Sequence, residues 1–113
     1  MKLEVGMYVR TKGGFIDKII SFKSTISNDY VELEDEYYAN KKDIVKASNN
    51  IIDLIEAGDY VNGIRVTSVH KTVDDNVLIG LGDTFGFSKF DNDYQIKTIV
   101  TSQQFESMQY EVN

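Results

Sequence analysis

The sequence predicts a mainly β protein of 113 residues, made of two small antiparallel barrels in tandem with one short helical turn near the C-terminus. Three observations lead to this prediction. The chain contains short runs rich in Val, Ile, Phe and Tyr, these runs are separated by Gly, Asn and Asp, and an internal repeat divides the chain into two parts. A single larger β-sandwich is the alternative.

The internal repeat defines the expected units. Residues 3–9, LEVGMYV, return as IEAGDYV at residues 55–61, with Glu, Gly, Tyr and Val in the same order. A second similarity at nearly the same offset relates residues 43–46 to residues 97–100, so duplication explains the pattern better than chance does. The expected units are an N-terminal barrel, residues 1–49, and a C-terminal barrel, residues 50–113.

The first unit is expected to begin with a hairpin closed by Gly13-Gly14, because glycine adopts the positive φ of a tight turn at no steric cost. A two-residue turn would place Arg10 opposite Asp17, and an exposed ion pair between them would add little stability. Strands are expected over residues 16–22 and 30–33. The expected core residues of this hairpin are Met7, Val9, Ile16, Ile20 and Phe22.

The second unit contains the strongest hairpin signal, Asn62-Gly63, because a type I′ turn needs positive φ at both central positions. Closure on this turn would pair Val61 with Ile64 on the inner face and Tyr60 with Arg65 on the outer face. The further strands expected in this unit are residues 77–79, 84–87 and 94–100.

One helical turn is expected, over residues 102–108. Thr101 can act as its N-cap, and Gln104, three residues later, can complete a capping box. Units of about fifty residues with short strands and tight turns correspond in size and turn layout to SH3-like barrels.

The composition argues against several classes of function. The chain has no Cys, so disulfides, thiolate nucleophiles and cysteine-ligated metals are excluded. Its net charge of −6 argues against direct nucleic-acid binding. No apolar run approaches the roughly 18 residues of a membrane span, which favours the cytosol. The single histidine, His70, shows no catalytic or metal-ligand spacing, so no catalytic residue, metal or cofactor is expected and the protein is not expected to be an enzyme.

One segment of the first unit combines acidic and aromatic side chains. Glu32, Glu34 and Glu36 alternate with other residues and would form an acidic ladder if the strand continued through them. Such a surface suits a basic protein partner or mimicry of a nucleic-acid backbone, and a solvated strand face is the alternative. The expected partner surface comprises Tyr30, Glu32, Glu34, Glu36, Tyr37 and Tyr38.

A second candidate site, for a small nucleotide ligand, belongs to the C-terminal unit. Arg65 would lie beside Tyr60 with no acid opposite it, which suits an anion or a planar ring; an arginine that merely covers a tyrosine is the alternative. Lys89 stands among aromatic residues that either line a pocket or belong to the core. The candidate ligand residues are Tyr60, Arg65, Lys89, Phe90 and Tyr94.

The segments IIDLIEAGDYVNG, residues 51–63, and TSQQFESMQYEV, residues 101–112, resemble a group of small uncharacterised proteins from phages and prophages of Firmicutes. Gln103 stands where that group commonly has Glu, and the resemblance assigns no functional residue. It implies a non-catalytic accessory protein in the host cytosol that antagonises a host defence component through protein–protein contact. Sequestration of a nucleotide immune signal, such as a cyclic nucleotide or an ADP-ribose derivative, is the alternative, and self-association is left open.

Overall fold

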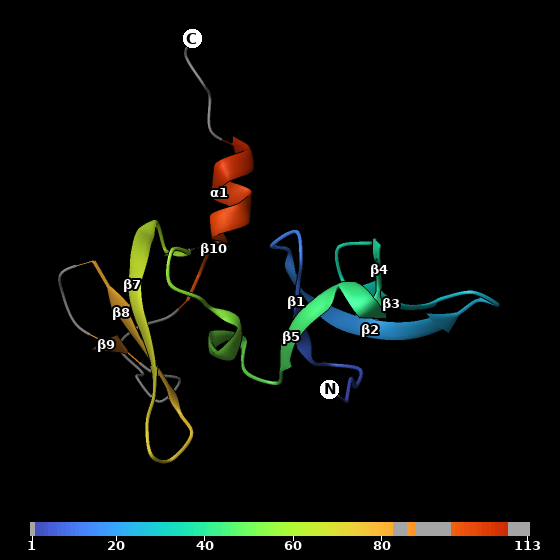
Figure 1. Cartoon of the computed structure of the whole chain (residues 1–113), viewed down its shortest axis with the longest axis horizontal. Helices are drawn as coiled ribbons and strands as arrows, with labels where there is room; N and C mark the ends of the chain where they lie inside the picture. The colour runs from blue at the N-terminus through green and yellow to red at the C-terminus, as the bar shows by residue number, and fades with distance from the viewer. Residues whose placement is uncertain (1, 83–85, 88–95, 109–113) are drawn as a thin grey trace, which may run out of the picture. The chain divides into compact units, whose positions relative to one another are not determined.

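A computed structural model describes residues 2–82, 86–87 and 96–108 (Figure 1). The protein is mainly β, with two antiparallel sheets and one short C-terminal helix, as the sequence predicts. The chain forms two compact units, Met1–Leu54 and Ile55–Asn113, and each unit contains one sheet. The unit boundary therefore follows the short 3-10 helix η2, Ile51–Leu54, which contacts strands of the first unit.

The first sheet has the strand order β4-β3-β2-β1-β5. A second 3-10 helix, η1, lies between its fourth and fifth strands, and its N-cap Asn40 accepts a hydrogen bond from the Lys42 backbone N–H. The elements are β1 (Tyr8–Thr11), β2 (Ile16–Ser24), β3 (Asp29–Leu33), β4 (Tyr38–Asn40), η1 (Lys41–Asp43) and β5 (Ile44–Ser48).

The second sheet has the order β10-β6-β7-β8-β9, so in both units the last strand pairs with the first. No strand pairing closes either sheet into a barrel among the described residues. The elements are β6 (Tyr60–Val61), β7 (Ile64–Lys71), β8 (Val77–Leu81), β9 (Gly86–Phe87), β10 (Ile99–Val100) and α1 (Ser102–Met108). Of the expected strands 84–87 and 94–100, residues 84–85 and 94–95 lie outside the described residues.

The repeated segment of the first unit forms a tight turn that precedes β1. Gly6 has a φ of 96°, which favours glycine, and its N–H donates to the Ile19 carbonyl at 2.9 Å. The Met7 N–H donates to the Glu4 carbonyl at 3.2 Å, and the Ile19 N–H donates to the Met7 carbonyl at 2.9 Å. The turn is therefore joined to β2 by two backbone hydrogen bonds.

The repeated segment of the second unit forms the same turn with the same bonds. Gly58 has a φ of 98°, and its N–H donates to the Val66 carbonyl at 2.9 Å. The Asp59 N–H donates to the Glu56 carbonyl at 3.1 Å, and the Val66 N–H returns to the Asp59 carbonyl at 2.7 Å. The sequence repeat thus corresponds to a repeated local structure.

The β1–β2 hairpin differs from the expected register by one residue. The Thr11 N–H donates to the Phe15 carbonyl at 2.9 Å, so three residues, not two, form the loop. Arg10 consequently pairs with Ile16, and Asp17 lies opposite Val9. The predicted Arg10–Asp17 pair is wrong, because the longer loop shifts the register of the hairpin by one residue.

A β-bulge in β2 explains a second correction, the burial of Ile19 in place of Ile20. The pairing of β2 with β3 shifts between Ile19 and Ser21. Ile19 is 1% exposed, whereas Ile20, expected in the core, is 45% exposed. The buried core of the first unit comprises Val9, Ile19, Val31, Leu33, Ala39 and Ile44.

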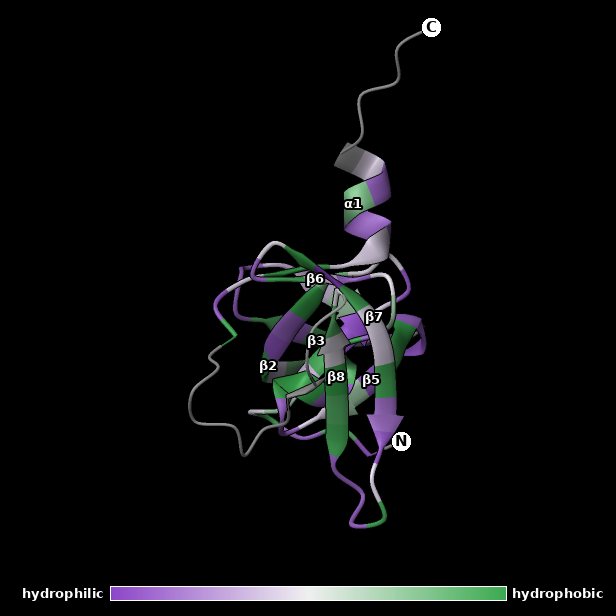
Figure 2. Ribbon diagram, turned by 90° about the vertical axis from the view of Figure 1, so that its left-hand side faces the viewer, coloured by the Kyte–Doolittle hydropathy of each residue, from purple (hydrophilic) through white to green (hydrophobic). Residues whose placement is uncertain are grey.

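The β6–β7 hairpin confirms the expected turn. Asn62 and Gly63 have φ values of 51° and 81°, and Val61 pairs with Ile64 and Tyr60 with Arg65. Ile64, expected on the inner face, is nevertheless largely exposed, because it lies next to the turn. The buried hydrophobic residues in the described part of this unit are Ile55, Val61, Val66, Val77, Ile79 and Leu81, and the β8 ribbon is strongly hydrophobic (Figure 2).

The α1 helix begins with the predicted capping box. The Gln104 N–H donates to the Thr101 hydroxyl at 3.2 Å, and the Thr101 N–H donates to the Gln104 side-chain oxygen at 3.0 Å. The Ser102 N–H donates to the Asp59 carboxylate at 2.9 Å, which joins this helix end to the turn before β6.

Candidate functional site

Three strands of the first unit carry polar and aromatic side chains on the face opposite the core. The pairs Lys23–Tyr30 and Tyr30–Asn40 form one row across β2, β3 and β4, and the pairs Ser21–Glu32 and Glu32–Tyr38 form another. Directly paired residues share a face, and the buried Val31 and Ala39 belong to the other one. We call this surface the tyrosine face: Ser21, Lys23, Tyr30, Glu32, Tyr38 and Asn40.

Local hydrogen bonds hold the tyrosine face in place. The Ser21 hydroxyl donates to the Glu32 carboxylate at 2.7 Å. The Asn40 side-chain N–H donates to the Asn28 side-chain oxygen at 3.2 Å, which joins the end of β4 to the β2–β3 turn. The position of each side chain on this surface is therefore set by strand register and reinforced by its neighbours.

Lys23 lies against Tyr38 within this surface. Its ammonium donates to the Tyr38 hydroxyl at 2.8 Å and lies 4.9 Å from the centre of the ring. The hydrogen bond to Tyr38 raises the pKa of Lys23 above its ordinary value, and the charge of Glu32 acts in the same direction. The Lys23 side chain stays exposed despite these contacts.

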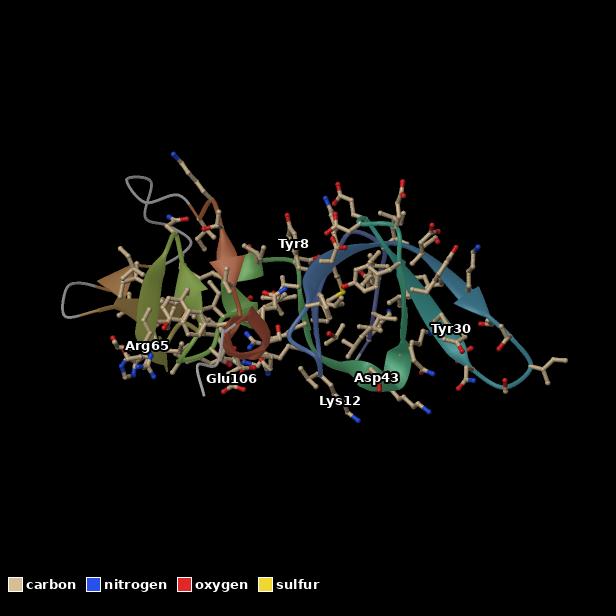
Figure 3. The ribbon with its side chains drawn as sticks, turned by 90° about the horizontal axis from the view of Figure 1, so that it is seen from above. Tyr8, Lys12, Tyr30, Asp43, Arg65 and Glu106 are labelled. Atoms are coloured by element: carbon tan, nitrogen blue, oxygen red, sulfur yellow. The ribbon has the colours of Figure 1, made fainter. Side chains whose placement is uncertain are left out.

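Two open hollows adjoin Tyr38, which is 48% exposed. The first, of about 360 Å³, is lined by Lys23, Thr25, Tyr30 and Tyr38. The second, of about 410 Å³, extends from Tyr38 to the β1–β2 turn and η1, where Lys12 and Asp43 lie side by side, 4.0 Å apart (Figure 3). Its lining residues are Thr11, Lys12, Gly13, Phe15, Tyr37, Tyr38, Ala39, Asn40 and Asp43.

The expected acidic ladder does not form, because β3 ends at Leu33. The Glu36 N–H donates to the Leu33 carbonyl at 3.1 Å, and Glu36 has a φ of 66°, so the chain turns back toward β4. Glu34 and Glu36 are exposed in this turn, and Glu32 alone of the three belongs to the tyrosine face. Sequence alternation was misleading because it holds only where the strand continues.

Tyr37 also lies away from the tyrosine face. Its ring packs against the core of the first unit and makes an edge contact with Phe15, with ring centres 5.8 Å apart. Its hydroxyl is buried and has no hydrogen-bond partner within the described part of the chain. Burial of the phenol, together with the charges of Asp17 and Asp35, raises the pKa of Tyr37 to about 12.

We expect a titration of tyrosinate absorbance to show a component near pH 12 that Tyr37→Phe removes. Because the pKa is higher in the folded than in the unfolded state, this tyrosine contributes stability that is fully present below pH 10 and is lost as pH rises toward 12. Tyr8→Phe is the matched control and should retain the late component. An unchanged titration curve for Tyr37→Phe would contradict the assignment.

The candidate ligand residues of the second unit are only partly brought together. Tyr60 pairs with Arg65, as expected, and Arg65 is exposed. The Tyr60 ring, however, stacks on Phe105 of α1, with ring centres 4.5 Å apart, so one of its faces is already covered. Lys89, Phe90 and Tyr94 lie outside the described residues.

No metal centre is found in residues 2–82, 86–87 and 96–108, because no three His, Asp or Glu side chains there are grouped to hold an ion. His70 is exposed on β7. None of the helices in the described part is long and apolar enough to span a membrane.

Sequence reasoning missed Lys23 and Thr25, which complete the first hollow. The strand expected from the sequence ended at residue 22. In the structure the Thr25 N–H donates to the Asn28 carbonyl at 2.8 Å, and closure of this turn puts Lys23 opposite Tyr30.

Comparison of the chain with protein-family models, curated proteins and solved structures finds no match. The site is therefore interpreted from its own chemistry.

Proposed function

We propose that the protein is a non-catalytic binding module that contacts a partner protein through the tyrosine face. The observation that supports this function is the pair Tyr30 and Tyr38, which line one open hollow on the outer face of a three-stranded surface. Tyrosine is enriched at protein interfaces because its ring offers a large contact area and its hydroxyl a hydrogen bond. Glu32 and the exposed acids of the adjoining turn favour a basic partner.

The arrangement of the hollows favours an extended polypeptide segment. Tyr38 lines both hollows, so they form neighbouring depressions rather than one enclosed chamber. A site for a small molecule normally surrounds most of its ligand, whereas a polypeptide can place successive side chains in adjoining depressions. The nucleotide alternative ranks second because Phe105 covers one face of Tyr60.

The proposed architecture is an SH3-like layout in each unit. Support comes from the shared strand order, in which the fifth strand pairs with the first, and from η1 immediately before β5 in the first unit. On the resemblance to phage and prophage proteins, the proposed partner is a host defence component, and the proposed site of action is the host cytosol.

Capture of partners from a bacterial host lysate tests this function, with mass spectrometry of both the proteins and the small molecules retained. The double variant Tyr30→Ala/Tyr38→Ala should weaken capture of a specific protein by about tenfold or more, because central interface tyrosines commonly contribute 2 kcal/mol or more.

Tyr8→Ala is the matched control, since Tyr8 also lies beneath a lysine, Lys18, but lines neither hollow. Equal capture by the wild type and the double variant would rule out the tyrosine face as the interface. Recovery of a nucleotide without a protein would favour the alternative instead.

A further inference from the structure

Three lysines of the first unit lie over aromatic rings. The ammonium-to-centre distances are 5.8 Å for Lys18 over Tyr8, 4.9 Å for Lys23 over Tyr38 and 5.1 Å for Lys41 over Phe22. Such pairs occur roughly once per 70–80 residues in proteins, so a unit of this size is rich in them. The rings of this unit are therefore placed where a cation can approach them.

The first hollow combines this preference with negative charge. Glu32 lies on the same face as Tyr38 and pairs with it directly. Aromatic rings with a carboxylate beside them on the same face attract a cation and disfavour an anion.

We infer that the hollow lined by Tyr30 and Tyr38 receives an arginine or lysine side chain of the partner, and that Lys23 occupies this position in the free protein. This inference rests on the proposed function and names the chemistry that the tyrosine face recognises. Lys23 can be displaced at small cost because it is exposed and its contact with Tyr38 is solvated. The displaced ammonium can then move toward solvent on its flexible stem.

Two roles of Lys23 lead to opposite effects when the side chain is removed. If Lys23 held a partner carboxylate or phosphate, its removal would weaken binding. If Lys23 occupies the place of a partner cation, its removal frees the Tyr38 ring and strengthens binding. A solvated cation–π contact is worth about 0.5–1 kcal/mol, so Lys23→Ala should tighten binding of a cation about two- to fivefold.

The test is a nuclear magnetic resonance titration with three defined probes: N-acetyl-arginine amide, N-acetyl-glutamate amide and neutral N-acetyl-norleucine amide. The arginine probe should shift the ring resonances of Tyr30 and Tyr38, and the other two should not. Lys23→Ala should bind the arginine probe about two- to fivefold more tightly than the wild type does, and Lys23→Gln should show the same gain. Glu32→Gln should weaken binding, and Tyr30→Ala/Tyr38→Ala should abolish it while Tyr8→Ala leaves it unchanged.

Two results would overturn the inference: binding of the glutamate probe that Lys23→Ala removes, or arginine binding that Lys23→Ala weakens. Absence of any arginine binding by both the wild type and Lys23→Ala would do the same. The outcome is independent of partner capture. If Tyr30→Ala/Tyr38→Ala loses the captured partner but the wild type does not bind the arginine probe, only the inferred ligand chemistry is refuted. If the wild type binds the arginine probe but the double variant still captures the partner, only the proposed interface is refuted.

Discussion

Replacement of Arg10 by alanine is expected to lower the free energy of unfolding of the first unit by about 3 kcal/mol. Arg10 is 0% exposed, and its Nη1 donates to the Leu54 carbonyl at 3.0 Å, which joins β1 to the end of η2. The alanine variant would leave that carbonyl without its donor and a cavity where the long side chain had packed. Urea denaturation, with amide hydrogen exchange of β1 and η2, measures the loss.

Two further variants separate the causes of this effect. Arg10→Met keeps much of the volume but removes the donor, so its destabilisation should be smaller than that of Arg10→Ala. Lys12→Ala is the control, because Lys12 is exposed and its ion pair with Asp43 should contribute at most about 1 kcal/mol. A loss in Arg10→Ala no larger than that of Lys12→Ala, about 1 kcal/mol at most, would contradict the expected role of the buried arginine.

Asp59→Ala is expected to lower the free energy of unfolding of the second unit by about 3 kcal/mol as well, because two backbone donors lose their acceptor. Asp59 is 0% exposed, and its carboxylate accepts the Glu56 N–H at 2.8 Å and the Ser102 N–H at 2.9 Å. The second bond lies at the start of α1, so the variant should also reduce protection of the helix from hydrogen exchange. Thermal unfolding and exchange at the α1 amides measure both effects.

The first unit provides a matched control for Asp59. Met7 occupies the corresponding repeat position, and its sulfur accepts the Glu4 N–H at 3.3 Å, a weaker and partly exposed contact. Met7→Ala should therefore lower the free energy of unfolding less than Asp59→Ala does. Asp59→Asn keeps one acceptor oxygen, so its stability should lie between that of the wild type and that of Asp59→Ala. An Asp59→Ala variant as stable as wild type, with normal α1 protection, would contradict the proposed link.

Local signals in the sequence predicted local structure well. Asn62 and Gly63 predicted the β6–β7 turn and its pairing because positive φ at both positions is a property of those two residues. Thr101 and Gln104 predicted the start of α1 because the capping box needs only side chains three residues apart. The repeat predicted two units, and in the structure its two copies form similar turns because the same Gly, with positive φ, stands at the same place in each.

Sequence alternation failed where a single residue changed the register. The loop between β1 and β2 has one residue more than Gly13-Gly14 suggested, and Arg10 moved from an expected surface pair to the interior. The bulge in β2 placed Ile19 in the core and left Ile20, which was expected there, exposed. Neither change is visible from residue types, since competing registers differ by small energies that only the packed core distinguishes.

The sequence by itself determined that the chain is mainly β, where two turns lie, how α1 begins and that Tyr30, Glu32 and Tyr38 are close in the chain. Tertiary structure decided which of these side chains share a surface. Lys23 joined them because β2 pairs with β3. Glu34 and Glu36 were separated from them because β3 ends at Leu33, and Tyr37 was separated because it lies opposite Leu33 and packs against the core. The physical reason is that a surface spanning several strands depends on hydrogen-bonded register between segments distant in sequence, and register is fixed only when the buried faces pack.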